Sequence, residues 1–126
     1  MKSFWAAIVI AVLLIGGGIL FNRNIDNVTR EMLEKQEKIT ELVEQKSFGD
    51  AKKEIDDLSE YIDKKMLVLA SVVDHKNIDE IELCVSEIEG YAKEEDKAEA
   101  MSKCKKLEHL ISHLPINYKV TLQNIL

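Results

Sequence analysis

Two cysteines are the residues of this sequence best suited to covalent chemistry. Cys84 and Cys104 are the only cysteines among 126 residues. If a helical turn is centred near Glu94, each lies ten residues from it, so an antiparallel hairpin brings them to the same level. One interpretation is a disulfide, which requires Cα atoms within about 7 Å and an oxidising compartment. The other is that both are small core residues, as free Cys usually is.

Three histidines form a second candidate site. His109 and His113 are four residues apart on one face of a predicted helix, and His75 lies in a predicted loop that can approach them. Such a trio could bind zinc, with Glu108 as a base if one coordination position stayed open. The order Glu-His-x-x-x-His differs from the His-Glu-x-x-His of zinc proteases. Surface or capping histidines near a helix C-terminus are the alternative, because positive charge is favoured there.

Other kinds of catalytic or ligand site lack a matching pattern. The acidic clusters do not follow the twelve-residue calcium loop with its central Gly, and are typical of solvated helix faces and caps. The serines lack the strand-turn-helix setting of a nucleophile elbow, and no Gly-rich phosphate loop occurs beyond the N-terminal segment. We therefore predict a protein that is not an enzyme and holds no cofactor.

An apolar run at the N-terminus indicates where the chain is located. Phe4 to Phe21 are eighteen residues without a charge, preceded by Lys2 and followed by Arg23. As a helix they would be about 27 Å long, close to the roughly 30 Å hydrocarbon thickness of a bilayer. We predict that residues 1–23 form a single transmembrane anchor and residues 24–126 a helical extracytoplasmic domain.

A cleaved signal peptide is the alternative to a retained anchor. It would have an apolar stretch of about 7–15 residues and a small-x-small cleavage site. The run here is longer, no such site follows it, and aromatic residues lie at both of its ends. Basic residues flank the run on both sides and do not decide its orientation. The short N-terminal tail followed by the apolar run resembles an uncut export signal. This favours a location outside the cytoplasm for residues 24–126, which we call the body.

The charge of the body narrows the class of partner. Only one of the 17 basic residues, and none of the 23 acidic residues, lies within the first 21 positions. A body with this negative excess is repelled by the phosphates of nucleic acids and by anionic lipid surfaces. We therefore expect no nucleic acid partner.

The spacing of apolar residues beyond the anchor predicts an all-α fold of antiparallel helical hairpins with about four helices. The first, from about Asp26 to Lys46, can continue directly from the membrane helix because no Pro or Gly intervenes. Gly49 is suited to a left-handed helix stop and Asp50 to capping the next helix. This second helix should run to Val73 and be the most buried.

Two capping-box spacings predict the starts of the remaining helices. Asn77 with Glu80 marks the third helix, and Asp96 with Glu99 marks the fourth, which Pro115 stops. Residues 116–126 fit either a short helix or an extended tail.

The two hairpins can be aligned with each other at a constant offset of 49 in the numbering, which suggests a duplicated helical hairpin. Chance matching of amphipathic helices is the alternative. The aligned pairs are Met32 with Ile81, Ile39 with Ile88, Ile55 with Cys104, Leu58 with Leu107 and Ile62 with Ile111.

Several short motifs resemble one known family. They are the uncut anchor, Asp-His-x-x-Ile-Asp-x-Ile-Glu from Asp74 to Glu82, Leu107-x-x-Leu110-x-x-His113, and the terminal Asn124-Ile125-Leu126. Together they are similar to the bacterial family known as domain of unknown function 4363. The resemblance implies a small, membrane-anchored, helical bacterial protein and carries no assigned activity.

These observations favour a non-catalytic protein of the cell envelope that is anchored by one membrane span and binds another membrane or envelope protein. Self-association through the imperfect heptad of the first helix, which Lys35 and Gln36 interrupt, is compatible with this reading. The alternative is a metal-binding or redox-active envelope protein that uses the three histidines or the two cysteines. A helical bundle with a ligand cavity beside Met66 to Val73 is a third hypothesis.

Overall fold

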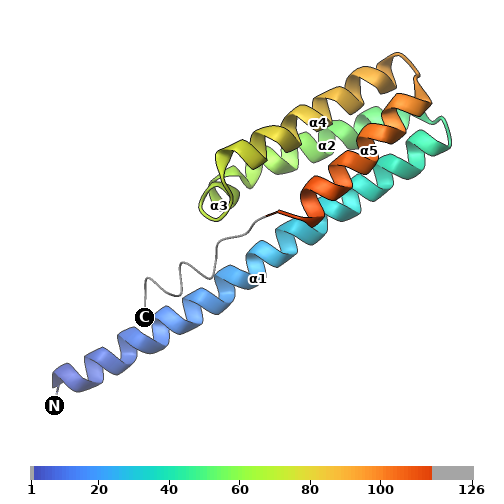
Figure 1. Cartoon of the computed structure of the whole chain (residues 1–126). Coiled ribbons are helices and arrows are strands. Elements are labelled where there is room, and N and C mark those ends of the chain that lie inside the picture. Colours follow the sequence, from blue (N-terminus) through green and yellow to red (C-terminus); the bar gives the residue numbers. More distant parts are fainter. Residues whose placement is uncertain (1, 115–126) are drawn as a thin grey trace.

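The computed structural model describes residues 2–114, apart from the side chains of Phe21 and Asn22. Within this range the regular secondary structure is α-helix with no strand, which confirms the predicted all-α class, and the prediction for residues 116–126 lies outside it. The elements are α1 (Lys2–Glu44), α2 (Phe48–Lys64), α3 (Met66–Ala70), α4 (His75–Lys93) and α5 (Lys97–Ser112). Figure 1 shows α1 extending well beyond the bundle that its second half forms with α2, α4 and α5.

The long helix α1 has two halves with opposite surroundings. The apolar residues from Phe4 to Leu20 lie on a part of α1 that is almost wholly exposed, and the first buried side chain of the core is Ile25. No break separates the halves, so the expected direct continuation is confirmed and the predicted boundary between residues 23 and 24 falls inside one helix. Among the described residues, α1 is the one helix long and apolar enough to cross a membrane.

The bundle is a ring of four antiparallel helices. α1 packs against α2 and α5, and α4 packs against α5 and α2. Amphipathic stripes with helical periodicity face the centre, where burying apolar surface provides the main stabilisation. The largest fully buried side chains of the four helices include Met32, Ile39, Ile55, Leu58, Ile62, Ile88, Leu107 and Ile111.

The turn between α1 and α2 differs from the prediction. Lys46 has the left-handed conformation (φ 60°), and its N–H donates to the Val43 carbonyl at 3.0 Å. The Ser47 N–H donates to the Leu42 carbonyl at 2.8 Å, which completes a Schellman motif. Gly49 therefore lies inside α2 and is not the helix stop, and Asp50 belongs to its first turn. The prediction was wrong because the left-handed residue that lets the Val43 and Leu42 carbonyls find donors is Lys46, three residues before Gly49.

The second predicted helix is also interrupted. α2 ends at Lys64, Lys65 leaves the regular helix, and α3 follows as a separate five-residue helix. The segment from Met66 to Val73 is not the most buried part, since Leu67 is 89% exposed. A continuous helix would have run past the end of the bundle, whereas the chain must turn there to pack α4 on the core.

The two capping predictions have opposite outcomes. Asp96 caps α5 as predicted, because its Oδ1 accepts a hydrogen bond from the Glu99 N–H at 3.2 Å. Asn77 does not cap α4, which already begins at His75 with Asp74 in the N-cap position. The capping signal predicted that the helix starts after Asn77, but it starts about one turn earlier. The earlier turn places the buried Ile78 within the helix rather than at its first residue.

The proposed internal repeat extends to features that the sequence pairs did not include. Glu95 has a φ of 57°, and its N–H donates to the Ala92 carbonyl at 3.1 Å, so the turn between α4 and α5 repeats the turn at Lys46. These two turns are separated by the same offset as the apolar pairs. The ends of α1 and α4, and the starts of α2 and α5, also keep that offset. The bundle thus consists of two equivalent hairpins, which supports duplication over chance matching.

An ion pair between the helices of each hairpin also follows the repeat. Lys38 and Glu54 join α1 to α2 at 3.1 Å, and Glu87 and Lys103 join α4 to α5 at 2.7 Å. The repeat offset maps Lys38 onto Glu87 and Glu54 onto Lys103, so the pair is retained with its charges exchanged. A contact retained with opposite polarity indicates that both hairpins use the same helix register.

Candidate functional site

The two cysteines lie in the core between α4 and α5. Both are buried free thiols, and the Cys84 Sγ donates to the Lys103 carbonyl at 3.3 Å, beside the helical turn that carries Cys104. Burial raises the pKa of Cys84 to about 11 and also raises that of Cys104. A reactive cysteine needs a lowered pKa and access to solvent, so this environment suits core thiols better than a redox centre.

The high thiol pKa values lead to a prediction about labelling. At pH 8, a pKa near 11 leaves about one thiolate in a thousand, so iodoacetamide should label the folded protein about a hundredfold more slowly than the unfolded protein. Mass spectrometry of alkylated, unreduced protein provides the measurement. The disulfide hypothesis predicts no alkylation even after unfolding, whereas free thiols predict two adducts per chain. Rapid labelling of the folded protein would contradict the buried arrangement.

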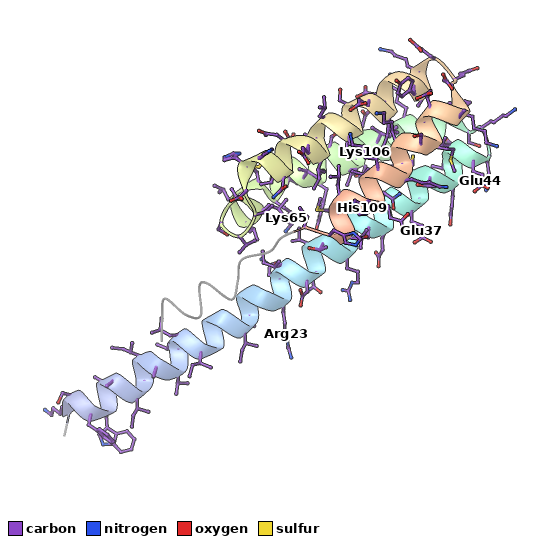
Figure 2. All side chains as sticks on the ribbon, in the orientation of Figure 1. Arg23, Glu37, Glu44, Lys65, Lys106 and His109 are labelled. Atoms are coloured by element: carbon purple, nitrogen blue, oxygen red, sulfur yellow. The ribbon has the colours of Figure 1, made fainter. Side chains whose placement is uncertain are left out.

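The three histidines do not form one site. The His109 and His113 rings stack on α5 with centroids 4.3 Å apart, and the His113 Nδ1 lies 3.1 Å from the His109 carbonyl. His75 begins α4, and all three residues are exposed. Among residues 2–114, no cluster of three or more His, Cys, Asp or Glu side chains is arranged to hold a metal ion. Figure 2 shows His109 on the surface of α5.

Gln36 is the buried polar residue of the bundle, at 4% exposure. Its Nε2 donates to the Cys104 carbonyl at 3.0 Å and to the Thr40 Oγ1 at 2.9 Å. In the sequence, Gln36 interrupts the apolar heptad of the first helix. In the structure, its hydrogen bond to the Cys104 carbonyl joins α1 to α5. Satisfied in this way, a buried amide helps to specify which helices pair and in which register.

Lys35, the other interruption of the seam, is held at the α1–α2 surface. Its Nζ lies 2.7 Å from the Asp57 carboxylate and 5.4 Å from the centre of the Tyr61 ring. The hydrogen bond raises the pKa of Lys35 and lowers that of Asp57. Burial, with a contribution from Glu31, raises the pKa of Tyr61 to about 12. These groups form a structural contact between the helices of the first hairpin.

Within residues 2–114, three grooves lie between the hairpins, and two of them are related by the internal repeat. The first, between α1 and α5, has a volume of about 470 Å³, and the second, between α2 and α4, has about 170 Å³. The repeat offset relates them, since Leu33 and Gln36 in the first correspond to Glu82 and Val85 in the second. The first is lined by Leu33, Gln36, Glu37, Thr40, Glu41, Glu108 and Ser112, and the second by Ser59, Ile62, Asp63, Glu82 and Val85.

Glu82 is a carboxylate in a position where the repeat has an apolar residue. Burial raises its pKa, and Asp63 and Asp79 raise it further. At neutral pH the folded state therefore penalises the charged form, and this penalty disappears as the pH falls through the raised folded pKa. We expect Glu82→Gln to stabilise the protein at neutral pH by about 0.5 kcal/mol after allowance for solvent screening.

Urea unfolding at neutral and mildly acidic pH tests this expectation. The stability difference between Glu82→Gln and the wild type should shrink in acid, because the wild-type carboxyl is then protonated. Glu80→Gln, at an exposed position on the same helix, provides the matched control. A variant that is equally stable or less stable than the wild type at neutral pH would contradict the predicted penalty.

The sequence predicted a buried Met66 to Val73 segment, with a ligand cavity beside it as one hypothesis, and did not predict an exposed apolar residue on α3. Its apolar composition was visible and was assigned to the core, whereas Leu67 is the most exposed large hydrophobic residue described. The sequence feature that could have indicated a binding surface is this apolar run next to Lys64 and Lys65. Whether the run faces the core or the solvent depends on the break after α2.

The family match covers the helical bundle and the end of the apolar run. Residues 19–125 match the family described as domain of unknown function (DUF4363). No curated protein and no solved structure matches the chain. The match extends from the last residues of the apolar run through both hairpins, and the chain belongs to the DUF4363 family of domains of unknown function.

Proposed function

We propose that this protein is a non-catalytic component of the cell envelope, held by a single membrane span and acting through binding to another membrane or envelope protein. The observation that carries the proposal is the continuity of α1 from its exposed apolar half into the core of the bundle. Such a helix couples the body to the membrane without a hinge.

The apolar half of α1 supports the membrane span. Exposed side chains such as Trp5 (66%), Leu13 (68%) and Leu20 (68%) occur on all sides of this segment, which has no protein partner within the described residues. In water this surface would be unfavourable by roughly 25 cal/mol for each Å² exposed, whereas hydrocarbon solvates it. The proposed orientation places the C-terminal body outside the cytoplasm.

A terminal reporter tests the orientation. A reporter that is active only in the cytoplasm, fused after Leu126, should be inactive in cells, and one that is active only outside the cytoplasm should be active. The opposite pair of results would reverse the proposed orientation and leave the membrane span in place.

The body supports an interaction role through its surface. The two grooves related by the repeat are open and their rims are acidic, and α1 carries a row of exposed carboxylates that includes Glu34, Glu37 and Glu41. Partner recognition on such a surface would depend on charge complementarity, which steers association and is sensitive to salt. A partner with a basic face is therefore expected.

Photocrosslinking in cells tests the interaction. A crosslinking amino acid at Glu37, on the α1–α5 groove, should capture one discrete protein, and one at Glu44, at the far end of α1, provides a matched control (Figure 2). Capture at Glu37 should weaken at high salt. If neither position on α1 nor any other exposed position of the body gives an adduct, the interaction role is refuted.

A further inference from the structure

One end of the bundle differs from the rest of its surface. α2 runs back toward the apolar half of α1, α3 crosses this end, and α4 then runs away from it. Figure 1 shows α3 at the end of the bundle from which the bare part of α1 emerges. We call this end, formed by residues 23–28, 64–77 and His113, the proximal end.

The register of the first hairpin gives the height of the proximal end, meaning its distance along α1 from the end of the apolar run. Lys35 pairs with Asp57, so Lys64, seven residues after Asp57, is level with Val28, seven residues before Lys35. Val28 is in turn seven residues, or about 10 Å, beyond Phe21 at the end of the apolar run. The headgroup layer is roughly 5–8 Å thick on each side of the hydrocarbon. For a membrane that accommodates the apolar run, the outer edge of the headgroup layer would therefore lie within about 5 Å of the level of Lys64, where α3 begins.

An apolar side chain projects from α3 at this height. Leu67 is 89% exposed, while Leu69 of the same helix is buried at 3% and fixes α3 on the bundle. Outside the apolar half of α1, the other exposed large hydrophobic residue among those described is Leu83, at 61%, on the middle of α4. Leu67 is thus held outward by the packing of its neighbours.

The charges of the proximal end are opposite to those of the body. Four basic residues lie there, against two acidic residues, Asp26 and Asp74. The other 21 acidic residues lie outside these ranges, with Asp63 and Asp79 closest to their limits in sequence. The four basic residues are Arg23, Lys64, Lys65 and Lys76.

The basic side chains of the proximal end are near the surface. Lys64 is 70% exposed in a solvent-exposed pair with Glu60 at 3.2 Å, and Lys65 is half-buried with its Nζ 5.9 Å from the Tyr61 ring centre. Figure 2 shows Arg23 and Lys65 at this end. Exposed ion pairs contribute little to stability, so Lys64 can exchange the Glu60 carboxylate for a lipid phosphate.

We propose that the proximal end docks on the anionic surface of the bilayer that α1 spans, with Leu67 inserted among the headgroups and the four basic residues facing lipid phosphates. This inference rests on the membrane span proposed above. An apolar side chain flanked by basic residues is the usual composition of an interfacial membrane contact. Two points of attachment would stop the bundle from rotating and tilting, and would present the α1–α5 groove at a constant height and angle.

Depth-dependent fluorescence quenching on the full chain tests this inference. The protein is reconstituted into vesicles of phosphatidylcholine and phosphatidylglycerol, with or without bromine on the acyl chains near the headgroup. Leu67→Trp in a Trp5→Phe background reports on α3, and Leu83→Trp in the same background is the matched control on an exposed apolar position of the body. Wild-type Trp5 reports on the anchor.

The expected result is quenching at position 67 several times stronger than at position 83, and weaker at position 67 when phosphatidylglycerol is omitted. An unquenched tryptophan at position 67 together with a quenched Trp5 would overturn the docking and keep the membrane span. Unquenched Trp5 would overturn the span and the docking together. Equal quenching at positions 67 and 83 would indicate general adsorption of the body to the membrane. A blue shift at position 67 without quenching would indicate that a protein covers α3. Either result would overturn the inference.

Discussion

Replacing both Ile10 and Leu13 by aspartate should release the protein from the membrane. Each Asp near the centre of a membrane helix costs about 2.5–3.5 kcal/mol of insertion free energy, so the pair should cost about 6 kcal/mol. These side chains are 57% and 68% exposed and lie outside the bundle core. The bundle should therefore keep its helical structure while its location changes. Alkaline extraction of membranes followed by detection of the protein gives the measurement.

Valine at the same two positions is the matched control, because it keeps the segment apolar at nearly the same volume. The valine variant should remain in the membrane pellet after alkaline extraction. A double aspartate variant that also stays in the pellet would show that the apolar half of α1 is not what holds the protein to the membrane. That result would contradict the proposed anchor whatever the orientation of the body.

Leu58→Ala and Leu107→Ala should both strongly destabilise the bundle, and by similar amounts. Each leucine is fully buried, and the repeat offset relates them. Replacing a buried Leu by Ala costs about 2–5 kcal/mol, through lost apolar transfer energy and the cavity that remains. The total stability of a small domain is about 5–15 kcal/mol, so either change removes a large part of it. Urea unfolding followed by far-UV circular dichroism in detergent measures the loss.

Leu83→Ala is the matched control for both core variants. Leu83 is 61% exposed, so its truncation should change the free energy of unfolding by less than about 0.5 kcal/mol. If Leu58→Ala and Leu107→Ala differed by more than the usual scatter between equivalent core sites, the two hairpins would not be energetically equivalent. A control that lost as much stability as the core variants would contradict the exposed position of Leu83.

Local pattern was enough to predict most of the fold. The apolar positions of the predicted stripes, such as Met32, Ile55 and Ile88, are buried in the core, because helical periodicity places them on one face whatever the partner. The Asp96 cap was also predictable, because it depends on residues within one turn. The repeat offset could be read from the same stripes.

The errors share a physical cause. Gly49 is compatible with a left-handed stop, but the chain stops at Lys46, where the carbonyls of α1 need donors. Asn77 has the spacing of a cap, but packing of Ile78 continues the helix through it. In each case a local preference of about 1 kcal/mol was outweighed by the packing of a whole hairpin.

The candidate chemistry could be predicted only as lists of residues. Spacing placed the two cysteines in neighbouring turns, and the Cys84 contact with the Lys103 carbonyl agrees with that placement. Spacing along α5 also put His109 and His113 side by side. Whether His75 would join them depended on how the α3 connection enters α4, which no pattern within one helix specifies.

By itself, the sequence determined the helical class, the apolar segment and the two equivalent hairpins, because each depends on periodicity and composition along the chain. The tertiary structure alone decided that Gln36 joins α1 to α5, that Leu67 is exposed, and that basic residues from three separate segments gather at the proximal end. The reason is that antiparallel packing brings together residues far apart in sequence, and their heights depend on a register that only the packed core sets.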